Sequence, residues 1–318
     1  MSDSSVVALD VGGTSIKGWL IDAAGRVCAE LERPTPVADG PDAVVAGLRG
    51  AARTLAVARP DAAAPVAAGV VVPGVVDADA GVAAYSANLG WRDVPLGRLL
   101  AADLDLPVAV GHDVAAAGLA ESTLGRARGA HDCLMVVIGT GIAGVLVADG
   151  TALRGATGTA GEIGHVPVYP DGEPCACGQR GCLETYASAA SLARRYAAAG
   201  GVGPATARDI VAEIANDPVA AQVWRDAVDA LAVALVAATM LLDPALIVLG
   251  GGLAEAGDAL LAPVCDGLAA RLAWRPAPEL AVSPLASRAG RVGAAILAWR
   301  AAGAEPFRSW TDRVGEPA

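Results

Sequence analysis

Short apolar runs alternate with glycine-rich turns and with longer apolar stretches along the whole chain. Brief apolar runs bounded by turn residues are typical of buried strands, and apolar positions three and four apart are typical of helices. The pattern predicts strands at residues 6–11, 15–22, 66–72, 106–110, 134–138, 145–148 and 245–249. It predicts helices at residues 41–58, 114–121, 186–199, 219–242, 259–270 and 291–302, with another helix start at Thr206.

This mixture of strands and helices predicts an α/β protein, and 318 residues suffice for two domains. The formal net charge of −11 argues against nucleic acid as a partner. The most apolar helix, residues 230–242, is too short to span a bilayer, and the N-terminus has no signal-peptide pattern. We therefore expect a cytoplasmic enzyme without a membrane partner.

One stretch gathers metal-ligand side chains within a few turns of chain. Cys175, Cys177 and Cys182 offer three sulfurs, and His165 offers a ring nitrogen. Three thiolates and one imidazole form the closed tetrahedral shell of structural zinc. The alternative is free or disulfide-bonded cysteines, although a Cys-x-Cys pair is too close to bridge to itself comfortably.

Two glutamates lie close to these ligands but are not needed by such a metal. Glu162 is three residues from His165, and Glu184 is two residues from Cys182. A metal would fix both carboxylates in space, and the free N–H of a ligating histidine would face an outer partner. Such a group suits a polyol, whose hydroxyls both donate and accept hydrogen bonds. Two solvated surface glutamates are the alternative.

Three glycine-rich turns follow predicted strands. The first contains Asp10, Gly12, Gly13, Thr14, Ser15 and Lys17; the second contains Gly139, Thr140 and Gly141; the third is Gly250, Gly251 and Gly252. Paired glycines let a backbone approach phosphate closely, and an acidic strand end suits the water shell of a magnesium ion. The strand–turn–strand design of the first turn recurs at the second, which suggests a duplicated fold. Plain hairpin turns remain the alternative for the first.

Two further polar positions are ambiguous without context. Asn88 lies in a polar and aromatic loop predicted at residues 86–91, in which Trp91 is expected to offer a flat apolar face. Asn88 offers a donor and an acceptor there, or simply makes a turn. Asp113 lies between a strand end and a helix start, where it caps the helix or serves as a general base.

Together these motifs resemble the ROK family of repressors, open reading frames and sugar kinases. The most specific match is residues 161–165 with residues 175–184, and the resemblance runs over about residues 6–302. It implies an actin-like, ribonuclease-H-like fold of two α/β domains around a cleft, with a structural zinc site. The implied small domain comprises residues 1–112 and a returning helix at 291–303. The implied large domain comprises residues 113–290, and residues 304–318 form a loosely held tail.

The resemblance also implies a role for each motif. Asp113 matches the catalytic base, and the first two glycine turns match the holders of ATP phosphates, with the third beside the adenosine. Asn88, Glu162, His165 and Glu184 match sugar contacts, and His165 with the three cysteines matches the zinc shell. The expected reaction is transfer of the γ-phosphate of ATP, with Mg²⁺, to a sugar hydroxyl that Asp113 deprotonates. Homodimers or homotetramers are favoured by the resemblance alone.

The chain departs from the family pattern beside the expected base. His112 stands where family kinases usually carry Asn, and Ala115 replaces another usual Asn. His112 is expected to contact a sugar hydroxyl with a different geometry. Glucokinase-type activity at the 6-hydroxyl is the leading prediction, and an N-acetylglucosamine or N-acetylmannosamine kinase is the alternative. A sugar-sensing regulatory protein is the third, but the first strand begins too early for a preceding DNA-binding domain.

Overall fold

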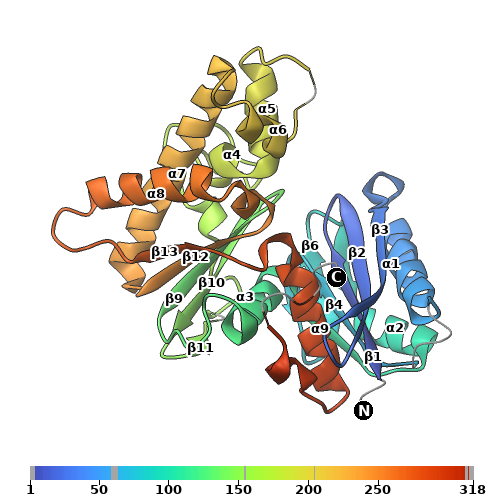
Figure 1. The fold of residues 1–318 in the computed structure, drawn as a ribbon. Coiled ribbons are helices and arrows are strands. Elements are labelled where there is room, and N and C mark those ends of the chain that lie inside the picture. Colours follow the sequence, from blue (N-terminus) through green and yellow to red (C-terminus); the bar gives the residue numbers. More distant parts are fainter. Residues whose placement is uncertain (1–3, 59–63, 154, 204, 312–313, 315–318) are drawn as a thin grey trace. The chain divides into compact units, whose positions relative to one another are not determined.

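The computed structural model describes residues 4–58, 64–153, 155–203, 205–311 and 314. The chain divides into two compact units. Unit 1 comprises Met1–Gly125 and Arg288–Ala318, and unit 2 comprises Arg126–Ser287. The elements of both are labelled in Figure 1.

Unit 1 is built on a five-stranded sheet with the order β3-β2-β1-β4-β8. Its strands are β1 (Ser5–Val11), β2 (Ser15–Asp22), β3 (Val27–Pro34), β4 (Pro65–Val72) and β8 (Val108–His112). Strand β1 pairs antiparallel with β2 and parallel with β4, which pairs parallel with β8. The parallel strands β1, β4 and β8 therefore end at one edge of the sheet, where polar side chains after them are brought together.

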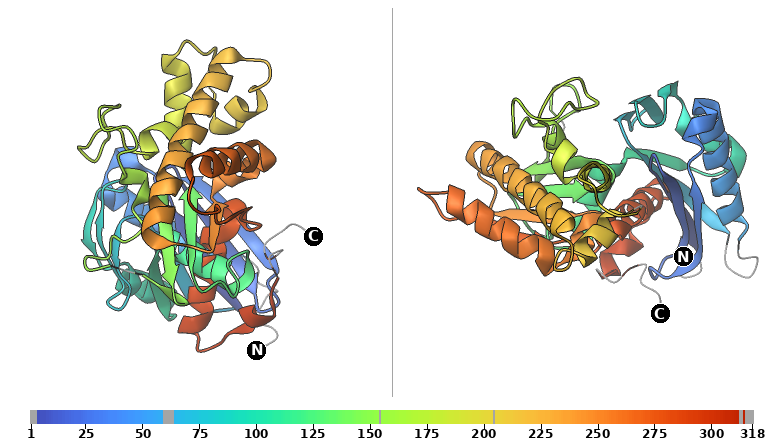
Figure 2. Two further views of the ribbon diagram at one scale, coloured as in Figure 1. Left: turned by 90° about the vertical axis from the view of Figure 1, so that its left-hand side faces the viewer. Right: turned by 90° about the horizontal axis from the view of Figure 1, so that it is seen from above.

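Helices cover both faces of this sheet. Helices α1 (Pro41–Ala56) and α2 (Leu96–Leu104) share an apolar core with alternate residues of β1 and β4, such as Leu9 and Val70. On the opposite face lie α3 (Asp113–Leu124) and α9 (Ala289–Ala301), as Figures 1 and 2 show. Gly69 permits this packing, because a Cβ there would lie 2.0 Å from the carbonyl oxygen of Ala294.

A three-stranded antiparallel sheet completes unit 1. It consists of β5 (Val75–Asp77), β6 (Val82–Ser86) and β7 (Trp91–Val94), in that order. The loop predicted at residues 86–91 is the turn between β6 and β7. Trp91 does not present a free aromatic face: it is 1% exposed, and its Nε1 donates to the carbonyl of Pro41 at 3.1 Å.

Unit 2 repeats the architecture of the first sheet. The order is β11-β10-β9-β12-β13, with β9–β10 and β10–β11 antiparallel and β9–β12 and β12–β13 parallel. These strands are β9 (Cys133–Ile138), β10 (Ile142–Ala148), β11 (Thr151–Ala152), β12 (Leu246–Gly250) and β13 (Glu279–Val282). Both sheets have the same order and the same directions, which confirms the predicted duplication.

The helices of unit 2 bury one face of its sheet. They are α4 (Glu184–Ala187), α5 (Ala189–Ala198), α6 (Ala207–Ala212), α7 (Pro218–Leu242) and α8 (Asp258–Arg271). Leu134, Val136 and Ile247 of the strands share a core with these helices, and Figure 2 shows α7 beside α8. No helix in the described part of the chain is long and apolar enough to cross a membrane.

The single helix predicted over residues 186–199 is wrong. Ser188 interrupts it with an extended backbone (φ −72°, ψ 155°), and its Oγ accepts a hydrogen bond from the Ser191 N–H at 3.1 Å. Ser188 therefore ends α4 and caps α5. Short 3₁₀ helices complete the chain: η1 (Val37–Asp39), η2 (Ile163–His165), η3 (Gly252–Ala256), η4 (Ala286–Arg288) and η5 (Pro306–Ser309).

The compact units divide at other positions than the resemblance implies. The expected boundary at residues 112 and 113 lies at the start of α3, whereas unit 1 continues to Gly125. Helix α3 belongs to unit 1 because it packs tightly on α9: a Cβ on Gly293 would lie 2.2 Å from the Ala116 carbonyl oxygen. The returning segment likewise begins at Arg288 rather than at residue 291.

The expected loose tail at residues 304–318 is packed where the structure describes it. Phe307 and Trp310 are 2% and 5% exposed, and Trp310 Nε1 donates to the Ala23 carbonyl at 2.9 Å. Two buried aromatic side chains explain why this segment is held on unit 1. Residues 312, 313 and 315–318 lie outside the described residues.

Candidate functional site

Two acidic residues meet at one edge of the unit 1 sheet. Asp10 is next to last in β1 and pairs with Val71, while His112 ends β8 and pairs with Val72. Asp113 begins α3 immediately after His112. The Asp113 charge is close enough to raise the pKa of Asp10. The fold therefore brings together two of the predicted residues that are far apart in sequence.

Asp10 lies against the beginning of α9. A Cβ on Gly290 would be 2.4 Å from Asp10 Oδ2, so the carboxylate occupies space that only glycine leaves free. Burial, with the neighbouring charge of Asp113, raises the pKa of Asp10 to about 7, although Arg291 and Lys17 lower it. A carboxyl group with this pKa is protonated in a substantial fraction of the molecules near neutral pH.

The first glycine turn has an exposed tip and an anchored base. Gly12 N–H donates to the Ser15 carbonyl at 2.9 Å, and Thr35 Oγ1 donates to the Gly12 carbonyl at 2.6 Å. Gly13 and Thr14 are exposed. The backbone of this tip is therefore held in shape by groups on its inner side, as a phosphate-binding turn requires.

Two other predicted residues flank this turn. Asn88 is exposed, and a Cβ on Gly13 would lie 3.7 Å from Asn88 Cβ, so the predicted sugar contact adjoins the predicted phosphate turn. Lys17 lies opposite Asp10 in the strand register, and its Nζ is 3.5 Å from Glu32 Oε1. In this conformation the Lys17 ammonium is paired with a carboxylate of β3.

Asp113 is not the cap of α3, because that role belongs to His112. The Ala115 N–H donates to His112 Nδ1 at 3.3 Å, and His112 Nε2 lies 3.4 Å from Asp113 Oδ1. Asp113 Oδ1 also accepts the Val114 N–H at 2.7 Å. Burial raises the pKa of Asp113, while the nearby His112 ring and the Val114 N–H act to lower it.

In unit 2 the second glycine turn is tied directly to Glu184. The Ile142 N–H donates to Glu184 Oε2 at 2.8 Å. A Cβ on Gly141 would lie 2.6 Å from the same oxygen, so glycine is required for this approach. The Ala189 N–H of α5 donates to the Gly139 carbonyl at 2.8 Å, and Thr140 is exposed. The predicted sugar contact and phosphate turn are thus adjacent in unit 2.

The third glycine turn lies at the same edge of the unit 2 sheet. Gly250 ends β12 and pairs with Val137 of β9, one residue before the end of that strand. Gly251 has φ +81°, and a Cβ there would lie 2.5 Å from the Ile138 carbonyl oxygen. Gly252 is exposed. The second and third turns therefore border one open edge of the sheet.

Glycine spacing also explains how Glu162 and His165 are presented. The Gly144 N–H donates to the Gly161 carbonyl at 2.7 Å, and a Cβ on Gly164 would lie 2.1 Å from the Ile142 carbonyl oxygen. Residues 161–164 therefore lie directly against the backbone of β10, and Ile163 enters the core of unit 2. Glu162 is left exposed, with its Oε2 4.0 Å from His165 Nε2.

The four predicted metal ligands converge on one point. One donor atom of each of His165, Cys175, Cys177 and Cys182 lies within 4.8 Å of the others. The Cys177 and Cys182 sulfurs are 3.7 Å apart, and His165 Nδ1 is 3.8 Å from the Cys175 sulfur. Sulfurs about 2.3 Å from a shared tetrahedral ion are about 3.8 Å apart, so the donor set fits zinc.

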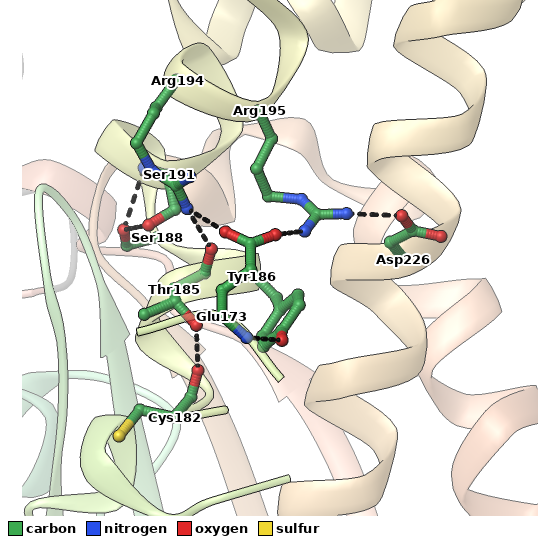
Figure 3. Close-up of polar contacts among 9 residues, drawn as sticks. All are labelled: Glu173, Cys182, Thr185, Tyr186, Ser188, Ser191, Arg194, Arg195 and Asp226. Atoms are coloured by element: carbon green, nitrogen blue, oxygen red, sulfur yellow. Dashed lines mark hydrogen bonds and ion pairs between the residues drawn. The ribbon is translucent and has the colours of Figure 1, made fainter. Parts of the chain in front are cut away.

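The metal loop is also anchored by ion pairs that sequence reasoning missed. Figure 3 shows Glu173 accepting from both Arg194 and Arg195 of α5, while Arg195 Nη2 donates to Asp226 of α7 at 2.6 Å. The Glu173 N–H donates to Tyr186 Oη at 2.8 Å. These contacts hold the segment before Cys175 on the helices that follow Glu184. The partners are far apart in sequence, so the only available signal for these ion pairs was the pair of consecutive arginines, Arg194 and Arg195, in a predicted helix.

Comparison with known proteins places these features in context. The model of the ROK family matches residues 6–301. A glucokinase of Halalkalibacterium halodurans is 36% identical over 317 aligned residues, which cover 93% of this chain and 96% of that protein. An N-acetylmannosamine kinase of Citrobacter koseri is 35% identical, with 92% and 98% covered. The crystal structure of a Streptomyces griseus ROK family glucokinase with glucose and AMPPNP has a TM-score of 0.83, 28% identity, and 93% and 100% coverage.

Proposed function

Because the chain belongs to the ROK family, we propose that it is an ATP-dependent hexose kinase of the glucokinase type that phosphorylates the 6-hydroxyl of its sugar. The similarity to the Halalkalibacterium halodurans glucokinase, which extends over nearly the whole of both chains, carries this proposal. The actin-like fold of two α/β domains agrees with the duplicated sheets of units 1 and 2. The protein is accordingly a phosphotransferase with an alcohol acceptor.

Unit 1 supplies the base and one set of phosphate contacts. A sugar hydroxyl is a weak nucleophile at neutral pH, and Asp113 removes its proton as the new oxygen–phosphorus bond forms. The Asp113 carboxylate directly follows β8 and is partly exposed, and burial of the rest of the group raises its pKa. These features support the role of a base. Asn88 contacts the sugar, and the exposed backbone of Gly13 and Thr14 receives the phosphates.

Unit 2 supplies the other contacts. Glu162, His165 and Glu184 bind sugar hydroxyls, and the turn at residues 139–141 binds phosphate through backbone N–H groups. The turn at residues 250–252 lies by the adenosine. The hydrogen bond from Ile142 to Glu184 supports this division, because one loop then orients both a sugar contact and a phosphate contact.

Two metals complete the proposal. Magnesium bound to ATP neutralises phosphate charge, and Asp10 is the carboxylate suited to its water shell. Zinc held by His165 Nδ1 and three cysteine sulfurs has a structural role. His165 Nε2 then remains for a hydrogen bond, and its position 4.0 Å from Glu162 Oε2 supports a role toward the sugar.

The test is ADP formation with ATP and magnesium across glucose, mannose, glucosamine, N-acetylglucosamine and N-acetylmannosamine. We expect turnover with glucose and a loss of at least about a hundredfold in kcat for Asp113→Asn, with sugar binding retained. A variant that kept its rate would contradict the assignment of the base. Binding without turnover on every sugar would instead indicate a regulatory sugar-binding protein.

An N-acetylhexosamine kinase is the second candidate. The similarity to the Citrobacter koseri N-acetylmannosamine kinase covers nearly the whole of both chains at almost the same identity as the glucokinase. The same sugar panel separates the two, because a preference for a 2-acetamido sugar in kcat/KM would replace glucose as the proposed substrate.

A further inference from the structure

Both ring nitrogens of His112 lie close to protein groups. The Ala115 N–H is 3.3 Å from Nδ1, and Asp113 Oδ1 is 3.4 Å from Nε2. A neutral imidazole has one acceptor nitrogen and one donor nitrogen. Since a backbone N–H donates to Nδ1, that nitrogen must be the acceptor, and the proton is on Nε2, which lies 3.4 Å from the carboxylate oxygen.

The same two contacts define which oxygen of Asp113 is engaged by protein. Oδ1 receives the Val114 N–H at 2.7 Å and faces His112 Nε2. Both of these contacts are to Oδ1, so Oδ2 is the oxygen that we assign to a substrate. The side chains of His112 and Asp113 are each 28% exposed, so the pair is open to a small molecule on one side.

We infer that His112 is a positioning residue: through Nδ1 it caps α3, and through its Nε2 proton it orients Asp113 so that Oδ2 receives the sugar hydroxyl proton. This rests on the proposed kinase function. In the step, the sugar oxygen bonds to the γ-phosphorus and its proton passes to Oδ2. The bond from that phosphorus to the bridging oxygen breaks, and the electron pair leaves with ADP. This role differs from the direct sugar contact that the sequence predicts for His112.

Two substitutions separate the contacts of the ring. Asparagine offers an acceptor near the position of Nδ1 and is a favoured cap, but it does not reach the position of Nε2. Glutamine reaches that position with an amide donor but is a poor cap. His112→Asn therefore keeps the cap and loses the contact to Asp113, and His112→Gln does the reverse. His131→Asn, at an exposed loop position of unit 2, is the matched control.

The experiment measures kcat, sugar affinity and Tm for these variants of the full chain. For His112→Asn we expect kcat to fall by about tenfold or more while sugar Kd changes less than twofold and Tm is kept. His112→Gln should retain more of kcat and lose a few degrees of Tm, since it removes the cap of α3. An unchanged kcat with weakened sugar binding in His112→Asn would overturn the inference in favour of direct sugar contact.

A spectroscopic measurement tests the geometry independently of activity. The chain has three histidines, so ¹⁵N spectra of wild type and His112→Asn assign the ring nitrogens of His112 by difference. We expect an unprotonated Nδ1 and a protonated Nε2 at neutral pH. The opposite tautomer would overturn the inference. A wild type that phosphorylates none of the sugars, yet shows the expected tautomer, would refute the kinase function and leave the contact pattern established.

Discussion

Asp10 gives the clearest prediction about stability, because its pKa lies far from that of an ordinary aspartate. Burial beside Asp113 moves it from 3.8 to about 7. At about 1.4 kcal/mol for each pKa unit, this difference corresponds to about 4 kcal/mol. We therefore expect that Asp10→Asn, which removes the charge but keeps the shape, stabilises the protein at neutral and alkaline pH.

The sign follows from proton binding. Between about pH 4 and pH 7 the folded state holds a proton on Asp10 that the unfolded state has released, so this group makes stability fall as pH rises. The penalty is complete above about pH 7 and absent below about pH 4. Because water reaches part of this side chain, we expect the variant to gain about 2–4 kcal/mol at pH 8 and almost nothing at pH 4.

Urea unfolding in magnesium-free buffer without nucleotide, at several pH values between 4 and 8, measures this gain. Tryptophan emission is a suitable signal, because Trp19, Trp91 and Trp299 are fully buried in unit 1 with Asp10. Asp79→Asn, an exposed carboxylate of the same unit, is the control. If the two variants showed the same pH dependence, the assigned burial penalty of Asp10 would be wrong.

Three further outcomes follow from the geometry. Gly164→Ala should destabilise the protein by at least about 2 kcal/mol in thermal unfolding, since its Cβ would lie 2.1 Å from the Ile142 carbonyl oxygen; unchanged Tm would refute the tight packing. Cys182→Ser should lose the zinc found by metal analysis of the wild type, whereas Cys265→Ser should keep it. The kcat/KM for sugar should fall as pH is lowered, because protonation of Asp113 removes the base. Since the pKa of Asp113 is raised, this fall should be centred above pH 3.8, and a fall centred at or below pH 3.8 would contradict the assignment.

Much of the fold follows from local sequence pattern. The repeated strand–turn–strand design around the first two glycine turns predicts the duplication, because apolar runs and paired glycines specify sheet strands locally. The metal cluster was equally visible, since all four of its donor residues lie within one short stretch. Features whose residues lie close together in the sequence can thus be predicted from the sequence alone.

Features that depend on long-range packing could not be predicted from the sequence. Nothing in residues 186–199 marks Ser188 as a break, because serine is tolerated in helices and its capping role depends on the position of α5. The pairing of Arg195 with Glu173 and Asp226 joins three separate segments. Trp91 and Trp310 likewise look like exposed aromatic residues until their apolar surroundings are known.

Two carboxylates of the proposed site, those of Asp10 and Glu184, lie directly against the backbone of glycines. Asp10 Oδ2 approaches Gly290, and Glu184 Oε2 approaches Gly141, where a Cβ would lie only 2.4 and 2.6 Å away. In the sequence alone, each acidic residue is recognised by its chemical type, and glycines are recognised as residues of turns. In both units, however, a glycine distant in sequence leaves the space that the carboxylate occupies. The placement of charge in this protein therefore depends on glycines as directly as on the acids themselves.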